Sequence, residues 1–408
     1  MKATDGTRLY STLPKFENAR TWAEIDLGAL KENFEYLQGI INLQADEAGV
    51  KRPEPICVVK ADAYGHGARG VVPTLLASGC RFFAVSSAEE AAEIRNICRI
   101  RRYSANILVL GVVPTQLAEV LASYDIITTV PSLEYAKRLS LAAREAGVRI
   151  RVHVKLDTGM NRLGFPAHDK ESIEKTACEI AECANLGGIS VEGMFTHFAE
   201  ADDGSSQELA GANLRQAERF FEVSKLLEYR GISISFYHMC NTAASLRFPN
   251  LALDGVRMGI SLYGAAPSEE FELPLRPVMS LKTEIYHVHT LPAGEKLGYG
   301  GCFSADTDRV IATLPIGYAD GFLRAYGGAF VRVDSKKGSF NAPIVGRICM
   351  DQCMIDVTDG LEYLPEAGDE VTLFGDDQKR LCELARLGDT IPYEVLCAVS
   401  SRVIRLYK

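Results

Sequence analysis

A lysine directly follows an apolar segment that is typical of a buried strand. Residues 56–59 are apolar and partly β-branched, and Lys60 ends this run before a loop that contains two glycines, Gly65 and Gly67. Burial favours the neutral form of an amine, and the neutral amine is the nucleophile that condenses with carbonyl compounds. On spacing alone, the plainer interpretation, a strand-end lysine that reaches solvent, has the better support.

The same arrangement recurs along the first two thirds of the chain, where apolar strands alternate with amphipathic helices. Such alternation predicts a parallel sheet, and eight units predict a closed (β/α)₈ TIM-like barrel over residues 1–274. Reactive side chains of this fold lie at the carboxyl ends of the strands, where Lys60, Lys155, His197, His238 and Arg257 are all expected. We expect strands at residues 56–59, 82–85, 107–110, 126–130, 150–156, 191–196, 232–237 and 253–258, and helices that include residues 88–98, 132–146, 171–183 and 206–229.

The last third has a different pattern. Short alternating runs separated by Gly, Asp and Pro predict a mostly β domain over residues 275–408, with a short helix at 381–387. Residues 45–54 are expected to form a surface loop, and residues 1–24 an extension or a strand that joins the second domain. The strands expected in the second domain are residues 283–289, 310–314, 330–333, 354–357 and 370–374.

Composition excludes several classes of partner. The chain has 408 residues and a net charge of −9, which argues against binding to nucleic acid or anionic lipid. It contains no apolar run of the ~20 residues that a membrane span needs and no apolar leader at its start. The eleven cysteines are scattered, which predicts reduced thiols in a cytoplasmic protein and no metal site.

The motif from Lys60 to Gly67, Lys-Ala-Asp-Ala-Tyr-Gly-His-Gly, resembles the cofactor-lysine signature of the alanine racemases, which carry pyridoxal 5′-phosphate (PLP). A second motif, Gly298-Tyr299-Gly300, matches the catalytic tyrosine of that family. The resemblance implies that Lys60 and Tyr299 are the two catalytic residues, which exchange the α-proton of alanine on opposite faces of the cofactor. It also implies a homodimer with shared active sites, in which each lysine meets its neighbour's tyrosine.

Further matches imply a set of cofactor ligands. Arg257 matches the arginine that donates to the pyridine nitrogen, and His197 the histidine that links this arginine to the tyrosine. His238 matches a histidine beside the ring, and Thr242 stands where the family usually has serine. The full cofactor-binding set implied is Lys60, Tyr64, His197, Asn241, Thr242, Arg257, Gly259, Ile260 and Tyr393.

The resemblance also assigns substrate contacts. Arg162 occupies the position that holds the substrate carboxylate, and Lys155 matches a lysine that many members carry as a carbamate. Met350 and Asp351 match residues that line the substrate entrance. Tyr318, with Tyr393, matches the tyrosines that narrow this entrance, which suits a substrate as small as alanine.

The implied activity is interconversion of L- and D-alanine, with D-alanine supplied to peptidoglycan. Three alternatives stay open at this point. The first is a racemase of the same family for serine or another amino acid, and the second is a PLP-dependent decarboxylase of the same architecture. Decarboxylases place an acid, not an arginine like Arg257, against the pyridine nitrogen. The third is a non-catalytic PLP carrier, which would resemble the barrel alone.

Overall fold

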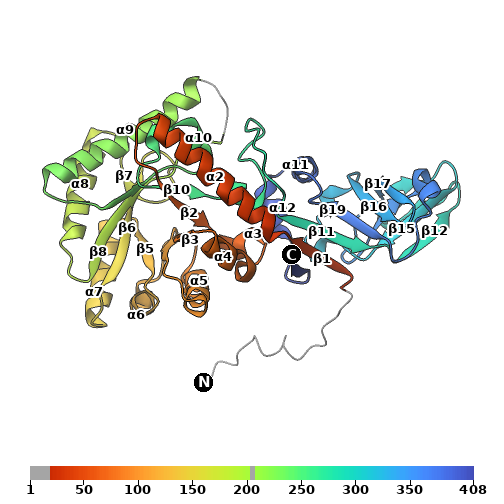
Figure 1. Ribbon diagram of the computed structural model, residues 1–408, viewed down its shortest axis with the longest axis horizontal. Coiled ribbons are helices and arrows are strands. Elements are labelled where there is room, and N and C mark those ends of the chain that lie inside the picture. The colour runs from red at the N-terminus through yellow and green to blue at the C-terminus, as the bar shows by residue number, and fades with distance from the viewer. Residues whose placement is uncertain (1–18, 203–206) are drawn as a thin grey trace.

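The computed structural model describes residues 19–202 and 207–408, and these residues form two large sheets. The expected N-terminal extension therefore lies almost entirely outside the described residues. A barrel surrounded by helices occupies one end of the molecule, and a mostly antiparallel sheet occupies the other (Figure 1). The first described strand, β1 (Thr21–Ile25), and the long helix α2 (Leu27–Glu47) lie where the two parts meet.

The barrel consists of eight parallel strands within the described chain. The last strand returns beside the first, and a parallel bridge between Asn241 and Arg257 joins the two ends of the sheet. The predicted (β/α)₈ barrel is thus confirmed. In sheet order the strands are β10 (Gly255–Met258), β2 (Glu54–Val58), β3 (Phe82–Val85), β4 (Asn106–Val109), β5 (Ile127–Val130), β6 (Ile150–Asp157), β8 (Ile189–Phe195) and β9 (Phe236–His238).

Helices cover the outside of the barrel, and several of them begin at polar caps. Ser87, Ser132 and Asp169 each accept a backbone N–H of the following helix, as their short polar side chains favour. The helices of this part are α2, α3 (Lys60–Tyr64), α4 (Ala68–Ala77), α5 (Ala88–Arg101), α6 (Ala118–Ser123), α7 (Leu133–Glu145), α8 (Lys170–Ala184), α9 (Gln207–Tyr229) and α10 (Thr242–Arg247).

Two expectations about this part were wrong in detail. The surface loop expected over residues 45–54 starts too early, because Ala45 is buried and α2 continues to Glu47. The strand expected at 232–237 is shorter and shifted, because only Phe236–His238 pairs with β8. No helix in the described part of the chain combines the length and apolarity that a membrane crossing requires.

The second part is a nine-stranded sheet that includes the N-terminal strand. β1 pairs antiparallel with β11 and parallel with β20, so both ends of the described chain lie side by side in this sheet. In sheet order its strands are β12 (His287–Leu291), β15 (Arg309–Leu314), β18 (Cys353–Asp356), β17 (Gly338–Val345), β16 (Phe330–Ser335), β19 (Glu370–Phe374), β11 (Met279–Glu284), β1 and β20 (Ile404–Tyr407).

The single strand expected over residues 283–289 is two strands. Ile285 donates its N–H to Asp369, whereas Tyr286 donates to Thr313, so the chain changes its pairing partner between β11 and β12. Further elements of this part were not expected from the sequence. They include β17, β20, the short paired strands β13 (Lys296–Leu297) and β14 (Phe303–Ser304), and the helix α12 (Pro392–Ala398), which follows α11 (Gln378–Leu387).

Candidate active site

Lys60 lies at the start of an unusual turn, two residues beyond the end of β2 at Val58. The four residues that follow, Ala61 to Tyr64, have φ between 51° and 55°, which is left-handed backbone that L-residues adopt only at a cost. Hydrogen bonds hold the turn: Ala61 N–H donates to Glu90 at 2.6 Å, and Ala68 N–H donates to the Asp62 carboxylate at 2.7 Å. The backbone therefore fixes Lys60 rather than leaving it on a flexible loop.

Segments from the end of the chain pack on the same turn. Gly65 has φ +79°, and a Cβ there would lie 2.5 Å from the carbonyl oxygen of Leu396 in α12. Arg405 donates to the carbonyl oxygen of Gly65 at 3.0 Å. The two glycines of the motif thus permit both a left-handed backbone and close approach of the C-terminal residues.

Lys60 lines a cavity of about 1170 Å³ at the carboxyl ends of the barrel strands. Most of the residues expected at the site line it, although they come from segments separated by more than 300 positions. They are Lys60, Tyr64, Lys155, Arg162, His197, Asn241, Thr242, Arg257, Gly259, Ile260 and Tyr393.

Four of these side chains carry positive charge, and burial in the cavity lowers the pKa of three of them. Burial lowers the pKa of the Lys60 amine, and the nearby Arg162 guanidinium lowers it further. Burial, followed by Arg162 and Arg257, lowers the pKa of Lys155 to about 8. Burial also lowers the pKa of Arg257 to about 10. Such a cluster of crowded cations favours anionic ligands.

Arg257 is fully enclosed and bonded to neutral groups. Its Nη1 donates to Nδ1 of His238 at 2.8 Å, and its Nη2 donates to Nδ1 of His197 at 3.1 Å. Nη2 also donates to the carbonyl oxygens of Thr196 and Met239, at 2.9 and 2.8 Å. Burial and then Arg257 lower the pKa of His197 to about 3, so this histidine is neutral at physiological pH. No described residue bonds Nε of Arg257, which remains able to donate.

The expected position of His238 needs a correction. This side chain is fully buried and does not line the cavity; it lies behind Arg257. The ring of Phe195 stacks on it, with centroids 4.7 Å apart. Phe195 does line the cavity, and Lys155 lies 5.7 Å from the centroid of its ring. His238 therefore contacts Arg257, not the space in front of it.

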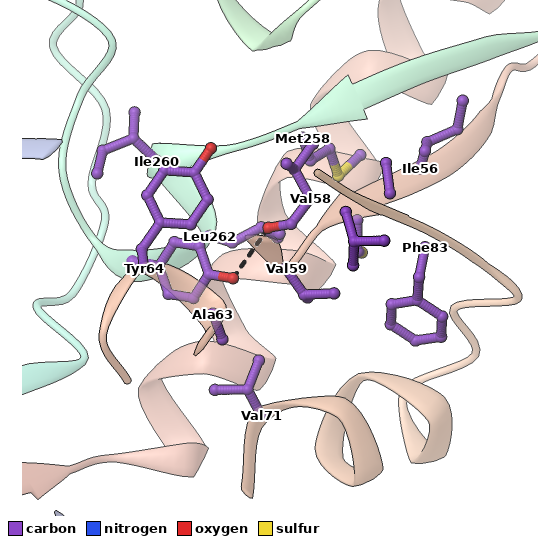
Figure 2. Close-up of a cluster of buried hydrophobic side chains, with 14 of the residues drawn as sticks. Ile56, Val58, Val59, Ala63, Tyr64, Val71, Phe83, Met258, Ile260 and Leu262 are labelled. Atoms are coloured by element: carbon purple, nitrogen blue, oxygen red, sulfur yellow. Dashed lines mark hydrogen bonds between the residues drawn. The ribbon is translucent and has the colours of Figure 1, made fainter. Parts of the chain in front are cut away.

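One wall of the cavity offers hydrogen-bond donors that the protein itself does not use. The hydroxyl oxygen of Thr242, which lines the cavity, is buried without a partner among the described residues. A Cβ at Gly259 would lie 3.2 Å from the Tyr64 hydroxyl, so the glycine leaves that group accessible. Figure 2 shows the Tyr64 ring next to Ile260. Burial raises the pKa of the Tyr64 phenol, which keeps its proton. These donors suit an anionic group such as a phosphate.

The remaining expected residues lie elsewhere. Tyr299, Tyr318, Met350 and Asp351 are in the β-rich part, and none of them lines the cavity. The first three are exposed, Tyr299 by 72%. Tyr318 and Met350 belong to adjoining turns, since Ala319 N–H donates to the Met350 carbonyl at 3.0 Å. One chain thus does not bring Lys60 and Tyr299 to one cavity.

Of the residues at or beneath the cavity that were not expected from the sequence, three contact the predicted site residues. Phe195 resembles an ordinary core residue at the end of a strand. Asp202, which accepts from the Asn241 amide at 3.1 Å, lies in a loop without a motif. His153 lies on β6 beneath the cavity, and the only signal for it was its spacing, two positions before Lys155 on the same face of the strand.

Comparison with known proteins gives consistent matches over nearly the whole chain. Residues 25–267 match the family model "Alanine racemase, N-terminal domain", and residues 278–407 match "Alanine racemase, C-terminal domain". A Clostridium tetani protein named alanine racemase is 42% identical over 395 residues, which cover 95% of each chain. A similar relative from Clostridium novyi is 39% identical over 393 residues, again 95% of each.

Solved structures agree with this. The chain superposes on the alanine racemase of Clostridium difficile 630 with a TM-score of 0.85 and 37% identity, covering 96% of each chain. It superposes on the alanine racemase of Bacillus anthracis with bound L-Ala-P with a TM-score of 0.81 and 32% identity, covering 96% of this chain and 95% of the other.

Proposed function

Because this chain belongs to the alanine racemase family, a family of isomerases, we propose that it interconverts L- and D-alanine with PLP as cofactor. The observation that carries the proposal is the cavity itself. A half-buried lysine with a lowered pKa, an exposed arginine and an enclosed arginine line one space at the carboxyl ends of the barrel strands. These are Lys60, Arg162 and Arg257.

The residues present fit PLP. The unpaired hydroxyl of Thr242 and the Tyr64 phenol beside Gly259 would hold the phosphate. Lys60 would hold the aldehyde carbon, and Arg257 would face the pyridine nitrogen. When bound, PLP supplies an electron sink for the carbanion that remains after the α-proton of the substrate has left.

Arg257 also restricts which reaction occurs. A guanidinium is always protonated at physiological pH and only donates hydrogen bonds. Through Nε it can donate to a ring nitrogen but cannot supply a proton to it. Arg257 would thus leave a pyridine nitrogen unprotonated and the bound ring a weaker electron sink. This favours rapid return of the proton, and it argues against the decarboxylase alternative, whose members place an acid there.

Lys60 and Tyr299 divide the proton transfer. We assign one face of the substrate to the Lys60 amine, whose lowered pKa brings its neutral, basic form closer to physiological pH. We assign the other face to Tyr299 of a second copy of the chain. Its exposure outside the cavity of its own chain supports this assignment, because the side chain is available to a neighbour. The enzyme proposed is therefore a homodimer with shared sites.

The substrate carboxylate is assigned to Arg162. Lys155 lies close enough to Arg162 for the two charges to interact. With a pKa of about 8, the Lys155 amine has a substantial neutral fraction that can react with carbon dioxide. A carbamate at Lys155 would replace a cation by an anion that orients Arg162. Tyr318, Met350 and Asp351 of the second copy would narrow the entrance, which favours alanine over larger amino acids.

The decisive test is a panel of amino acids incubated with the protein and PLP, followed by chiral chromatography. We expect L- and D-alanine to interconvert, with serine and larger substrates slower. Lys60→Ala should abolish the reaction and the absorbance of lysine-bound PLP. Release of carbon dioxide would indicate a decarboxylase instead, and bound PLP with no turnover of any amino acid would indicate a carrier.

A complementation experiment tests the shared sites. Lys60→Ala and Tyr299→Phe subunits should each have little activity alone. If the two residues of one site come from different chains, a mixed dimer contains one intact pair, and mixing the inactive variants should restore activity. No restoration after verified subunit exchange would refute the shared site. Free cysteines throughout the chain support a reducing compartment, the cytoplasm, where D-alanine would serve peptidoglycan synthesis.

A further inference from the structure

A continuous chain of hydrogen bonds runs from the cavity down into the barrel interior. His197 bonds Arg257 at 3.1 Å, Arg257 bonds His238 at 2.8 Å, and His238 Nε2 bonds Nδ1 of His153 at 3.1 Å. The members come from four barrel strands or their carboxyl ends, and His153 is the deepest of them. It is 2% exposed, and it makes no contact with the cavity.

These hydrogen bonds fix which ring nitrogen carries the proton in His197, His238 and His153. A guanidinium only donates, so Nδ1 of His238 accepts and its proton is on Nε2. That Nε2–H must donate to His153, whose Nδ1 therefore accepts. All three histidines are neutral because burial lowers their pKa values, that of His153 to about 3. Only one arrangement of protons satisfies every bond.

The surroundings hold the His153 ring in the position that this chain requires. Phe82 and Phe236 lie with their ring centroids 6.1 and 5.9 Å from it. Gly193 on β8 leaves room for it, because a Cβ there would lie 2.5 Å from the imidazole atoms. A neutral imidazole in an apolar enclosure loses hydration, and the bond to His238 compensates for part of this loss.

We propose that His153 is a positioning residue for the racemisation proposed above: its acceptor nitrogen pairs with the Nε2–H of His238 and, together with Arg257 on the other ring nitrogen, holds His238 in the tautomer that orients Arg257. Without an acceptor at position 153, the Nε2–H of His238 would be buried unpaired. His238 could then move its proton to Nδ1, where it would oppose the Nη1–H of Arg257. Arg257 would lose its shortest bond to an imidazole and shift away from the place it holds at the cavity.

Two substitutions separate hydrogen bonding from packing. His153→Leu removes the acceptor but keeps apolar bulk, whereas His153→Asn keeps an acceptor oxygen close to the place of Nδ1. Phe236→Leu is the matched control, because Phe236 packs against both His153 and His238 but takes no part in the hydrogen bonds that link the histidines to Arg257. The proteins are full-length, with and without PLP, and thermal unfolding confirms that each variant folds.

The direct readout is the ¹⁵N spectrum of protein labelled at its seven histidines, which reports the protonated nitrogen of each ring. In the wild type, in His153→Asn and in Phe236→Leu, His238 should carry its proton on Nε2. In His153→Leu a substantial fraction should carry it on Nδ1. If His153→Leu keeps the wild-type tautomer, the proposal is refuted.

Turnover provides the second readout. We expect kcat of His153→Leu to fall on the order of tenfold, which corresponds to about 1.4 kcal/mol, with KM for alanine nearly unchanged. His153→Asn should recover most of this loss. Equal losses in His153→Leu and Phe236→Leu would show that packing alone matters, and would also overturn the proposal. The ¹⁵N result does not depend on turnover, so a wild-type protein that fails to racemise alanine would refute the proposed function separately.

Discussion

Replacement of Lys155 by methionine should stabilise the cofactor-free protein at neutral pH while reducing its activity. Lys155 is 5% exposed and lies among three other cations, Lys60, Arg162 and Arg257. Methionine has similar length and no charge, so it keeps the packing and removes the repulsion. Without the cofactor, Lys155 therefore destabilises the fold, although it is the residue proposed above to orient Arg162 once it carries a carbamate.

The pKa of Lys155 gives the size and the sign of the effect. A fall from 10.5 to about 8 corresponds to about 3 kcal/mol of unfavourable charge in the folded state. Solvent reaches part of the cavity, so we expect Lys155→Met to gain about 1.5 kcal/mol at pH 7. Between pH 8 and 10.5 the unfolded chain holds a proton that the folded chain has lost, so wild-type stability rises with pH relative to the variant. The difference should disappear above about pH 10.5.

The assay is urea denaturation of both proteins without PLP at pH 7, 8.5 and 10, in buffers free of carbon dioxide so that no carbamate forms. The slope with urea should be equal in the two proteins. If Lys155→Met is less stable than wild type at pH 7, or if the difference does not change with pH, the reasoning is wrong. Added bicarbonate provides a control, because it should stabilise only the wild type.

Three further outcomes follow from the structure. Tyr299→Phe should slow racemisation from L-alanine more than from D-alanine, measured by initial rates in both directions; equal losses would refute the assignment of faces. Gly65→Ala should lower the free energy of unfolding by at least about 2 kcal/mol and weaken PLP binding. Alanine is strained at φ +79°, and its Cβ would lie 2.5 Å from the Leu396 carbonyl oxygen. Thermal unfolding and PLP titration measure the two effects. Asp320→Asn should lower the free energy of unfolding by about 2 kcal/mol, because Asp320 is 1% exposed and forms an ion pair with Arg20 at 2.7 Å. An unchanged midpoint of urea denaturation would contradict this.

Regular alternation made the barrel predictable from sequence. The strand at residues 82–85 begins and ends where expected, because its apolar run lies between Arg81 and Ser86. In the β-rich part, the strand at 370–374 also has the expected bounds and ends before Gly375. The break at Ile285 and Tyr286 could not be predicted in this way. Both residues continue the apolar pattern, and only the change of partner from Asp369 to Thr313 interrupts the strand.

Motifs predicted the lining of the cavity better than its chemistry. The sequence indicated Lys60 and Arg257 as site residues, but it did not indicate that Arg257 would be bonded only to neutral groups. It placed His238 beside the cofactor, whereas this histidine lies behind Arg257. His153 carries no motif at all. Its contact with His238, 85 positions away in the sequence, depends on side chains of β6 and β9, which are separated by β8, meeting in the barrel interior.

The turn that carries Lys60 connects the two parts of the molecule physically. Four consecutive left-handed residues cost on the order of 1–2 kcal/mol each, and no glycine relieves them. Such a turn persists only where the surroundings hold it, and several of these contacts come from the end of the chain, such as Arg405 on the Gly65 carbonyl, 340 positions away. Removal of the C-terminal part should therefore let the turn relax and misplace the amine of Lys60, even though every barrel strand would still be present. The lysine thus depends on the β-rich part of its own chain for its position, in addition to the tyrosine proposed to come from a second copy.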